Sequence, residues 1–255
     1  MQNAALEELG LSDEWSYEAI DVEPGEFAER VRELPQREFA GVNVTIPHKR
    51  AALEIADQAS EAAAEIGAAN TLSFPGGLIR AENTDAGGLL SALPEPPAGR
   101  RALVLGAGGS ARAAVWVLAG QAASVSVWNR TAERAAEVVR DLGGPESEGR
   151  VSAIDEEGVR AASFDLIVNC TAVGMADEDP FEHLPLDPGD LGPGVTLVDL
   201  VYAGEESRLV REARRRGGTA IDGLEVLVRQ GGESLRIWTG MDPPLEVMRA
   251  AARAD

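Results

Sequence analysis

The second half of the chain alternates short apolar runs with amphipathic segments, and this pattern narrows the possible folds more than any other feature. The apolar runs have strand length and are bounded by turn residues, whereas the segments between them have helical periodicity. Strands are expected at 102–105, 124–128, 151–154, 166–170, 196–201 and 219–221, and helices at 109–120, 131–142, 205–216 and 223–236. Because parallel strands need crossover helices, the pattern predicts a doubly wound parallel sheet.

A proline-rich linker, Pro94-Glu95-Pro96-Pro97-Ala98-Gly99, separates this half from the residues before it. In the first half, strands are expected at 15–22 and 40–45 and a hairpin at 70–83, with helices at 24–34, 47–56, 58–66 and 84–93. A final helix is expected near 243–252. We therefore predict an α/β protein of two domains. Residues 1–93, joined by a returning segment at 237–255, form the first, and residues 100–236 form the second, which is of Rossmann type.

Composition excludes several classes of function. A formal net charge of −20 argues against a nucleic-acid-binding protein. The single cysteine, Cys170, excludes an internal disulfide and a multi-cysteine zinc site, and the two histidines are far apart, so we expect no metal. No apolar run approaches the roughly 18 residues of a membrane span, and no secretory signal is recognisable. A cytoplasmic protein without membrane association is expected.

A glycine-rich loop, Gly106-Ala107-Gly108-Gly109-Ser110-Ala111, directly follows one expected strand and opens an expected helix. Small residues there let the backbone approach a pyrophosphate, whose charge is favoured at a helix N-terminus. At the end of the next strand, 21 residues after Gly108, an NAD-binding chain would carry Asp or Glu; this chain has Asn129-Arg130-Thr131, with Arg134 one helical turn later. Arginine pairs with a 2′-phosphate, so the predicted cofactor is NADP. The alternative is that Arg130 only ends a strand at the surface.

Lys49 is the only lysine in a chain whose other 22 basic residues are arginine. A site that keeps lysine in such a chain is expected to need a side chain that can release and retake a proton, which guanidinium cannot do near neutral pH. The apolar run Val42 to Ile46 predicts a buried strand just before it, and Pro47 suits the first turn of a following helix. Lys49 is therefore expected at the carboxyl end of a strand, where open α/β sheets bind ligands. The alternative is a lone lysine on a solvated surface.

Other polar positions carry weaker signals. Asn83-Thr84-Asp85 can be an ordinary helix cap, and Asn70-Thr71 can be routine turn chemistry. Thr171 to Met175 is expected to form a loop at the carboxyl edge of the sheet. Gln230, on an expected helix, would ordinarily be a solvated side chain.

Taken together, the motifs resemble those of the shikimate dehydrogenases. The resemblance begins with Asn43-Val44-Thr45-Ile46-Pro47-His48-Lys49, Gly67-Ala68-Ala69-Asn70-Thr71 and Asn83-Thr84-Asp85-Ala86-Gly87-Gly88. It continues through the glycine-rich loop, Asn129-Arg130-Thr131, Asn169-Cys170-Thr171-Ala172-Val173-Gly174-Met175, Asp199-Leu200-Val201-Tyr202 and Asp222-Gly223-Leu224. It spans nearly the whole chain, and the combination is specific although each motif alone is not.

The resemblance implies NADP-dependent, reversible reduction of 3-dehydroshikimate to shikimate, on the route to the aromatic amino acids. It makes the first domain substrate-binding and the second NADP-binding, and a homodimer is possible. Lys49 would be the proton donor and acceptor, with Asp85 as its partner. The implied substrate-binding residues are Asn43, Thr45, Asn70, Tyr202 and Gln230. The implied cofactor-binding residues are Gly106 to Ala111, Asn129, Arg130, Thr131, Arg134, Thr171, Met175, Leu200 and Gly223.

Two departures from the family pattern leave alternatives open. Family members begin with a strand and a Ser-x-Ser loop that binds the substrate carboxylate, whereas this sequence starts in the helix that follows. The 255-residue chain is therefore expected to bind NADP but to reduce 3-dehydroshikimate poorly. The family also usually has Gly-Met where Glu225-Val226 stands. The open alternatives are a quinate-type polyol dehydrogenase and a non-catalytic NADP-binding remnant.

Overall fold

The computed structural model describes residues 1–144, 149–176, 178–202 and 206–254. The chain forms two compact units: unit 1 comprises Met1–Gly88 and Leu227–Asp255, and unit 2 comprises Leu89–Val226. Both divisions fall inside helices, namely α5 (Asp85–Ala92) and α11 (Gly223–Thr239). The sequence placed them at the linker and at residue 236. The last part of α11 groups with unit 1 because its side chains bond to that unit; for example, Trp238 Nε1 donates to Leu72 O at 2.9 Å.

Unit 1 is built on a four-stranded sheet with the order β1-β3-β4-β2. Its strands are β1 (Gly41–Asn43), β2 (Gln58–Ala59), β3 (Thr71–Ser73) and β4 (Arg80–Glu82). The predicted hairpin is confirmed, since β3 and β4 pair antiparallel with Leu72 opposite Ala81. β1 is also antiparallel to β3, and β2 is parallel to β4.

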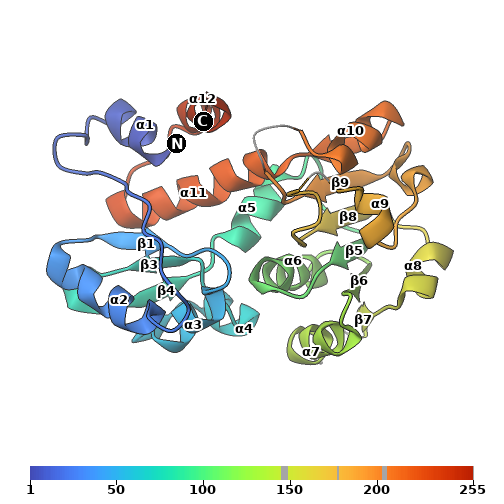
Figure 1. Cartoon of the computed structure of the whole chain (residues 1–255), viewed down its shortest axis with the longest axis horizontal. Coiled ribbons are helices and arrows are strands. Elements are labelled where there is room, and N and C mark those ends of the chain that lie inside the picture. The colour runs from blue at the N-terminus through green and yellow to red at the C-terminus, as the bar shows by residue number, and fades with distance from the viewer. Residues whose placement is uncertain (145–148, 177, 203–205, 255) are drawn as a thin grey trace. The chain divides into compact units, whose positions relative to one another are not determined.

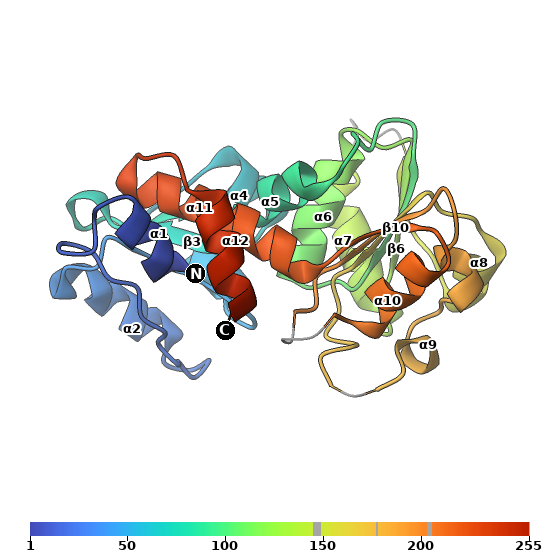
Figure 2. The ribbon, with the colours of Figure 1, turned by 90° about the horizontal axis from the view of Figure 1, so that it is seen from above.

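Helices cover both faces of this sheet (Figures 1 and 2). On one face lie α2 (Phe27–Glu33), α3 (Lys49–Glu54) and α4 (Glu61–Ile66), whose apolar side chains join Leu72 and Ala81 in a buried cluster. On the other face lies α11, and α1 (Gln2–Glu8) lies beside α12 (Leu245–Ala254).

Two predicted strands of unit 1 differ in the structure. Residues 15–22 were expected to form a strand, but they have no strand assignment, because no strand of the described sheet pairs with them. The strand expected at 40–45 shortens to β1. Val44 is buried, but Ile46 is 74% exposed, so the run Val42 to Ile46 is not a buried strand throughout. The following helix begins at Lys49, so Pro47 precedes it and does not lie in its first turn.

Unit 2 contains a six-stranded parallel sheet with the order β10-β9-β8-β5-β6-β7. The strands are β5 (Arg101–Leu105), β6 (Ser124–Trp128), β7 (Val151–Ala153), β8 (Leu166–Asn169), β9 (Thr196–Asp199) and β10 (Thr219–Ile221). The predicted doubly wound fold is confirmed. The strand order reverses between β5 and β8, and open α/β sheets bind ligands at the carboxyl ends of the strands flanking such a reversal.

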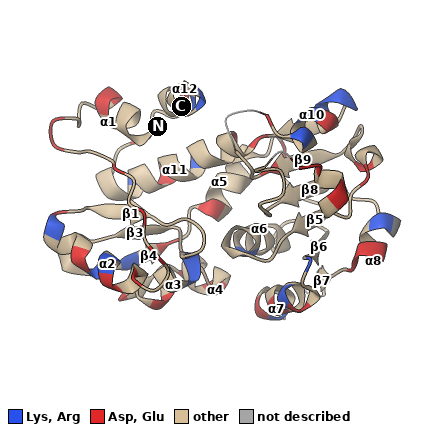
Figure 3. Ribbon diagram, viewed as in Figure 1, with Lys and Arg blue, Asp and Glu red and all other residues tan. Residues whose placement is uncertain are grey.

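The helices of unit 2 cover both faces of its sheet (Figure 1). On one face lie α6 (Gly109–Ala119) and α7 (Ala132–Leu142); on the other lie α8 (Glu156–Ala161), α9 (Pro180–His183) and α10 (Arg208–Arg215). The core beneath α8 and α10 joins Val159 and Leu209 to the strand residues Leu103, Ile167 and Leu197. Helices such as α7 and α10 carry both acidic and basic residues (Figure 3), and on α10 Glu212 forms an ion pair with Arg215.

Candidate functional site

Lys49 and Asp85 form an ion pair in unit 1. Lys49 Nζ lies 2.6 Å from Asp85 Oδ2, and the two side chains are only 12% and 15% exposed. Lys49 is the first residue of α3, and Asp85 is the first residue of α5. The N-terminus of α5 stabilises the carboxylate, because a helix carries partial positive charge at that end. The structure therefore holds an amine and a carboxylate together at the boundary between the unit's surface and its core.

Asn70 connects this pair to the rest of the cluster. Its Nδ2 donates to Asp85 Oδ1 at 2.9 Å and to Gln230 Oε1 at 3.0 Å, and its Oδ1 accepts from the backbone N–H of Thr84 at 2.7 Å. A carboxylate only accepts and a backbone N–H only donates, so the orientation of the Asn70 amide is unambiguous. Asn70 is 2% exposed and lies just before β3.

Four predicted polar residues of unit 1 thus meet: Lys49, Asp85, Asn70 and Gln230. Gln230 projects from α11, where its Nε2 also donates to Leu227 O at 3.1 Å. Asn43, at the end of β1, belongs to the same cluster through Asn43 Nδ2, which lies 3.5 Å from Asn70 O.

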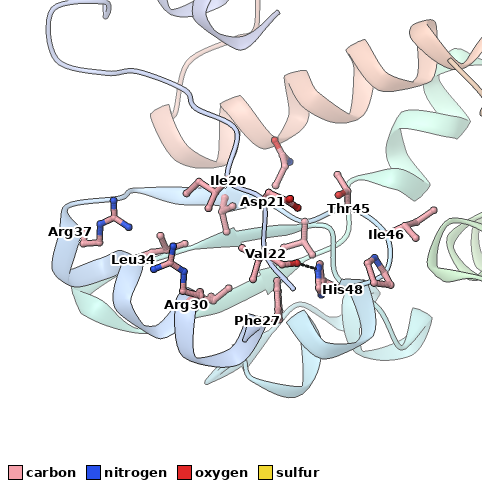
Figure 4. A pocket seen from close by; sticks show the side chains of 15 residues that line it. Ile20, Asp21, Val22, Phe27, Arg30, Leu34, Arg37, Thr45, Ile46 and His48 are labelled. Carbon is pink, nitrogen blue, oxygen red and sulfur yellow. Dashed lines mark hydrogen bonds between the residues drawn. The ribbon is translucent and has the colours of Figure 1, made fainter. Parts of the chain in front are cut away.

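Residues of β1 and α2 line a cavity of about 180 Å³ (Figure 4). Asn43 and exposed Thr45 line it, together with apolar side chains of α2 such as Phe27. The ring of Phe27 stacks on His48 at 4.5 Å, and His48 Nε2 donates to Val22 O at 2.9 Å. Lys49 and Asp85 are not among the lining residues. Of the predicted substrate-binding residues, the cavity is therefore lined only by Asn43 and Thr45.

The glycine-rich loop joins β5 to α6 in unit 2. Gly106 has φ +111°, a conformation that favours glycine, and a Cβ there would lie 3.2 Å from Cys170 O. Gly108 is the N-cap of α6, and a Cβ there would meet nothing within 4 Å. The backbone of this loop thus borders open space at the N-terminus of an 11-residue helix, an arrangement suited to the phosphates of a dinucleotide.

Arg130 and Arg134 lie beyond the end of β6, where the sequence placed the 2′-phosphate contact. Both are exposed, and the structure shows neither paired with a carboxylate among the described residues. Asn129 Nδ2 donates to Thr131 O at 2.9 Å and closes the turn into α7. Other arginines of unit 2, such as Arg101 and Arg112, are paired with acids, whereas Arg130 and Arg134 are available as cations among the described residues.

The remaining predicted residues lie on loops at the carboxyl ends of β8 and β9. Thr171 is half-buried, Met175 is 60% exposed and Tyr202 is 51% exposed. Leu200 lies directly after β9. A Cβ on Gly223 would lie 2.6 Å from Leu200 O, so Gly223 lets the start of α11 approach this loop closely. The structure thus gives Gly223 a packing role.

Asn169 and Asp199, which the sequence reasoning passed over as site residues, brace these two loops. They are register partners on β8 and β9, both fully buried, and Asn169 Nδ2 donates to Asp199 Oδ1 at 2.8 Å. Asn169 Oδ1 accepts from Thr171 Oγ1 at 2.7 Å, and Asp199 Oδ2 accepts from Ser207 Oγ at 2.5 Å. Burial raises the pKa of the Asp199 carboxyl, although these donors oppose the shift. In the sequence, the signal for both residues was a polar side chain at the end of an apolar run.

Neither a metal centre nor a membrane span is found in the residues that the structure describes. They contain no group of three or more His, Cys, Asp or Glu side chains able to hold an ion. No helix in the same ranges is both long enough and apolar enough to cross a bilayer.

Three family models match the chain. A shikimate dehydrogenase substrate binding domain matches residues 1–72, a shikimate / quinate 5-dehydrogenase model matches 92–176, and a shikimate 5'-dehydrogenase C-terminal domain matches 223–253. A shikimate dehydrogenase (NADP(+)) of Geobacter metallireducens is 42% identical over 258 residues, covering 98% of this chain and 88% of the relative.

Solved structures agree. The shikimate dehydrogenase of Aquifex aeolicus has a TM-score of 0.88 at 32% identity, with 99% of this chain and 91% of that chain covered. The shikimate 5-dehydrogenase of Thermus thermophilus, solved in complex with NADP(H) and shikimate, has a TM-score of 0.85 at 39% identity, with 99% and 92% covered. The chain therefore belongs to the shikimate dehydrogenase family.

Proposed function

We propose that Lys49 transfers the proton in the reaction of this enzyme and that Asp85 holds the Lys49 side chain in place. The chain is an NADP-dependent shikimate dehydrogenase, an oxidoreductase that interconverts 3-dehydroshikimate and shikimate. The observation that carries the proposal is the 2.6 Å contact between Lys49 Nζ and Asp85 Oδ2 within a cluster of uncharged hydrogen-bonding side chains.

Reduction of a ketone needs a hydride at carbon and a proton at oxygen. Bound NADPH supplies the hydride. As the carbon–oxygen double bond becomes single, negative charge builds on the oxygen, and an ammonium group held against it lowers the barrier by donating a proton. In the opposite direction the neutral amine of Lys49 takes the hydroxyl proton. The contact with Asp85 restricts the flexible lysine side chain to one position.

Asn70, Gln230, Thr45 and Asn43 are proposed to bind the hydroxyl groups of the ring. Asn70 and Gln230 already bond to one another and Asn70 to Asp85, so a substrate hydroxyl can enter this set by replacing one of these contacts. Thr45 is exposed and can donate or accept. Tyr202 is a further proposed substrate-binding residue.

The cofactor site is proposed to lie along the carboxyl edge of the unit 2 sheet. The backbone from Gly106 to Ala111 would hold the pyrophosphate, and Thr171, Met175, Leu200 and Gly223 would border the nicotinamide half. Arg130 and Arg134 would bind the 2′-phosphate, with Asn129 and Thr131 shaping the turn between them. Support comes from the open space at Gly108 and from the two arginines without a carboxylate partner in the described residues.

A quinate-type polyol substrate is the second candidate, because the family model over residues 92–176 describes both shikimate and quinate dehydrogenases. Quinate differs from shikimate in having a saturated ring with an additional hydroxyl, so the ratio of kcat/KM for the two alcohols with NADP⁺ decides between them. A homodimer and a cytoplasmic location are further proposals, and sedimentation measurements test the first.

The experiment that tests the proposed roles is steady-state kinetics on the purified chain with 3-dehydroshikimate and NADPH. We expect turnover by the wild type, a kcat at least about 100-fold lower for Lys49→Met and unchanged NADPH affinity in that variant. Turnover by Lys49→Met close to that of the wild type would remove Lys49 from proton transfer.

A further inference from the structure

Ser234, a fully buried hydroxyl on α11, lies at the centre of the polar cluster of unit 1. Its Oγ is 2.8 Å from Asn43 Nδ2, 2.7 Å from Thr71 Oγ1 and 3.0 Å from the backbone oxygen of Gln230. Asn43 and Ser234 are 191 positions apart in sequence, so this contact joins the end of β1 to the middle of α11.

The donors and acceptors around Ser234 set the direction of its bonds. The carbonyl oxygen of Gln230 can only accept, so the single hydroxyl proton of Ser234 is donated to it. The amide nitrogen of Asn43 can only donate, so Ser234 Oγ accepts from Asn43. Ser234 Oγ thus acts as an acceptor that keeps Nδ2 of Asn43 pointed into the cluster.

Tyr17 holds the other end of the same amide. Its hydroxyl donates to Asn43 Oδ1 at 3.1 Å, and its ring lies 6.3 Å from the ring of Trp238 on α11. The carboxamide of Asn43 is therefore held on its oxygen side by Tyr17 and on its nitrogen side by Ser234, which is the nearest acceptor, and by Thr71 Oγ1 at 3.2 Å. An amide oxygen has two lone pairs, so Oδ1 keeps one acceptor site for a further donor.

We propose that Ser234 and Tyr17 are positioning residues that orient the Asn43 amide, so that its oxygen accepts a hydrogen bond from a hydroxyl of the substrate ring. Ser234 is fully buried, so it would act on the substrate through Asn43 and not by direct contact. The inference rests on the proposed role of Asn43 in substrate binding. Its physical basis is that an amide rotated by half a turn would present donors in place of the acceptor and lose the ring hydroxyl.

The test compares Ser234→Ala and Tyr17→Phe with the wild type. The loss of one neutral hydrogen bond to the positioned amide should raise the KM for shikimate and its dissociation constant by roughly 2- to 13-fold. The kcat and the KM for NADP⁺ should change far less, because the proposed role of both residues is to orient the Asn43 amide.

Thr239→Val is the matched control. Thr239 lies on the same helix and makes the same kind of bond to the carbonyl four residues earlier, at 2.8 Å from Leu235 O, but it is outside the cluster. We expect an unchanged KM for shikimate in this variant. An equal rise in KM for Thr239→Val and Ser234→Ala would indicate general loosening of α11 and would overturn the inference.

Combination with Asn43→Ala shows whether Ser234 acts through Asn43. In that background, Ser234→Ala should add less than about twofold to the shikimate dissociation constant, because the amide that it orients is gone. Fully additive effects, or unchanged binding in both single variants, would contradict the inference. Absence of wild-type turnover alongside weakened shikimate binding in the variants would refute the proposed reaction and leave this inference standing.

Discussion

Replacement of Lys49 by arginine tests whether catalysis needs an exchangeable proton at this position or only a positive charge. Lys49→Arg keeps a cation near Asp85, but guanidinium does not release its proton near neutral pH. Lys49→Met keeps an unbranched side chain, one atom shorter, and removes the charge. If Lys49 transfers the proton, both variants lose turnover, whereas only the methionine variant also loses the ion pair.

The expected loss of turnover and the expected loss of stability can be estimated separately. General acid–base groups contribute typically 100- to 10,000-fold, so kcat should fall at least about 100-fold in both variants. In Lys49→Met, Asp85 Oδ2 loses its 2.6 Å partner while Oδ1 keeps the bond from Asn70. We expect a cost of about 1–3 kcal/mol in unfolding free energy, because the carboxylate is largely enclosed but retains one donor. Lys49→Arg should cost less.

The uniqueness of Lys49 gives a second assay. An amine-specific reagent can react with only two groups of this chain, the Lys49 side chain and the α-amino group. Inactivation by such a reagent, slowed by bound shikimate, would place Lys49 at the substrate. A Lys49→Arg enzyme with kcat within about fivefold of the wild type would refute the reasoning, since acid–base catalysis contributes far more than that.

Four further variants test unit 2. Arg130→Ala should weaken NADP binding about 10- to 150-fold but leave NAD binding almost unchanged, since only NADP carries the 2′-phosphate; titration of both cofactors tests this, and equal losses would contradict it. Gly223→Ala should lower the unfolding free energy by about 1–3 kcal/mol in urea titrations because its Cβ would meet Leu200 O at 2.6 Å. Gly108→Ala, with open space around the Cβ, should cost less than about 1 kcal/mol and instead weaken NADP binding. Asp199→Asn should remove a pH dependence of the unfolding free energy. Burial raises the pKa of the Asp199 carboxyl in the folded state. The contribution of Asp199 to stability is therefore fully present below its unfolded-state pKa and is lost as the pH rises through its folded-state pKa. The wild type should therefore lose stability relative to Asp199→Asn from roughly pH 4 upward, and parallel urea curves across this range would contradict the assignment.

The sequence was sufficient for the central strands of unit 2, such as β8 and β9, because every residue in them is buried. Such strands are continuous apolar runs bounded by turn residues, so a run such as Leu166–Asn169 is recognisable from its own residues. The prediction of a strand at 15–22 was wrong, because the residues of an edge strand do not by themselves specify its pairing. A strand at a sheet edge exists only if another segment pairs with it, and residues 15–22 have no such partner in the described sheet.

Roles for single residues could also be proposed from the sequence, because the only lysine, the glycine-rich loop and the arginine after the second Rossmann strand are informative by residue type and position. Which side chains share a hydrogen bond was not readable. Ser234 reaches Asn43 across 191 positions, and Asn169 meets Asp199 because β8 and β9 pair in that register. Hydrogen bonds act over about 3 Å and depend on direction, so they are decided only when strand ends and helices converge in the tertiary structure.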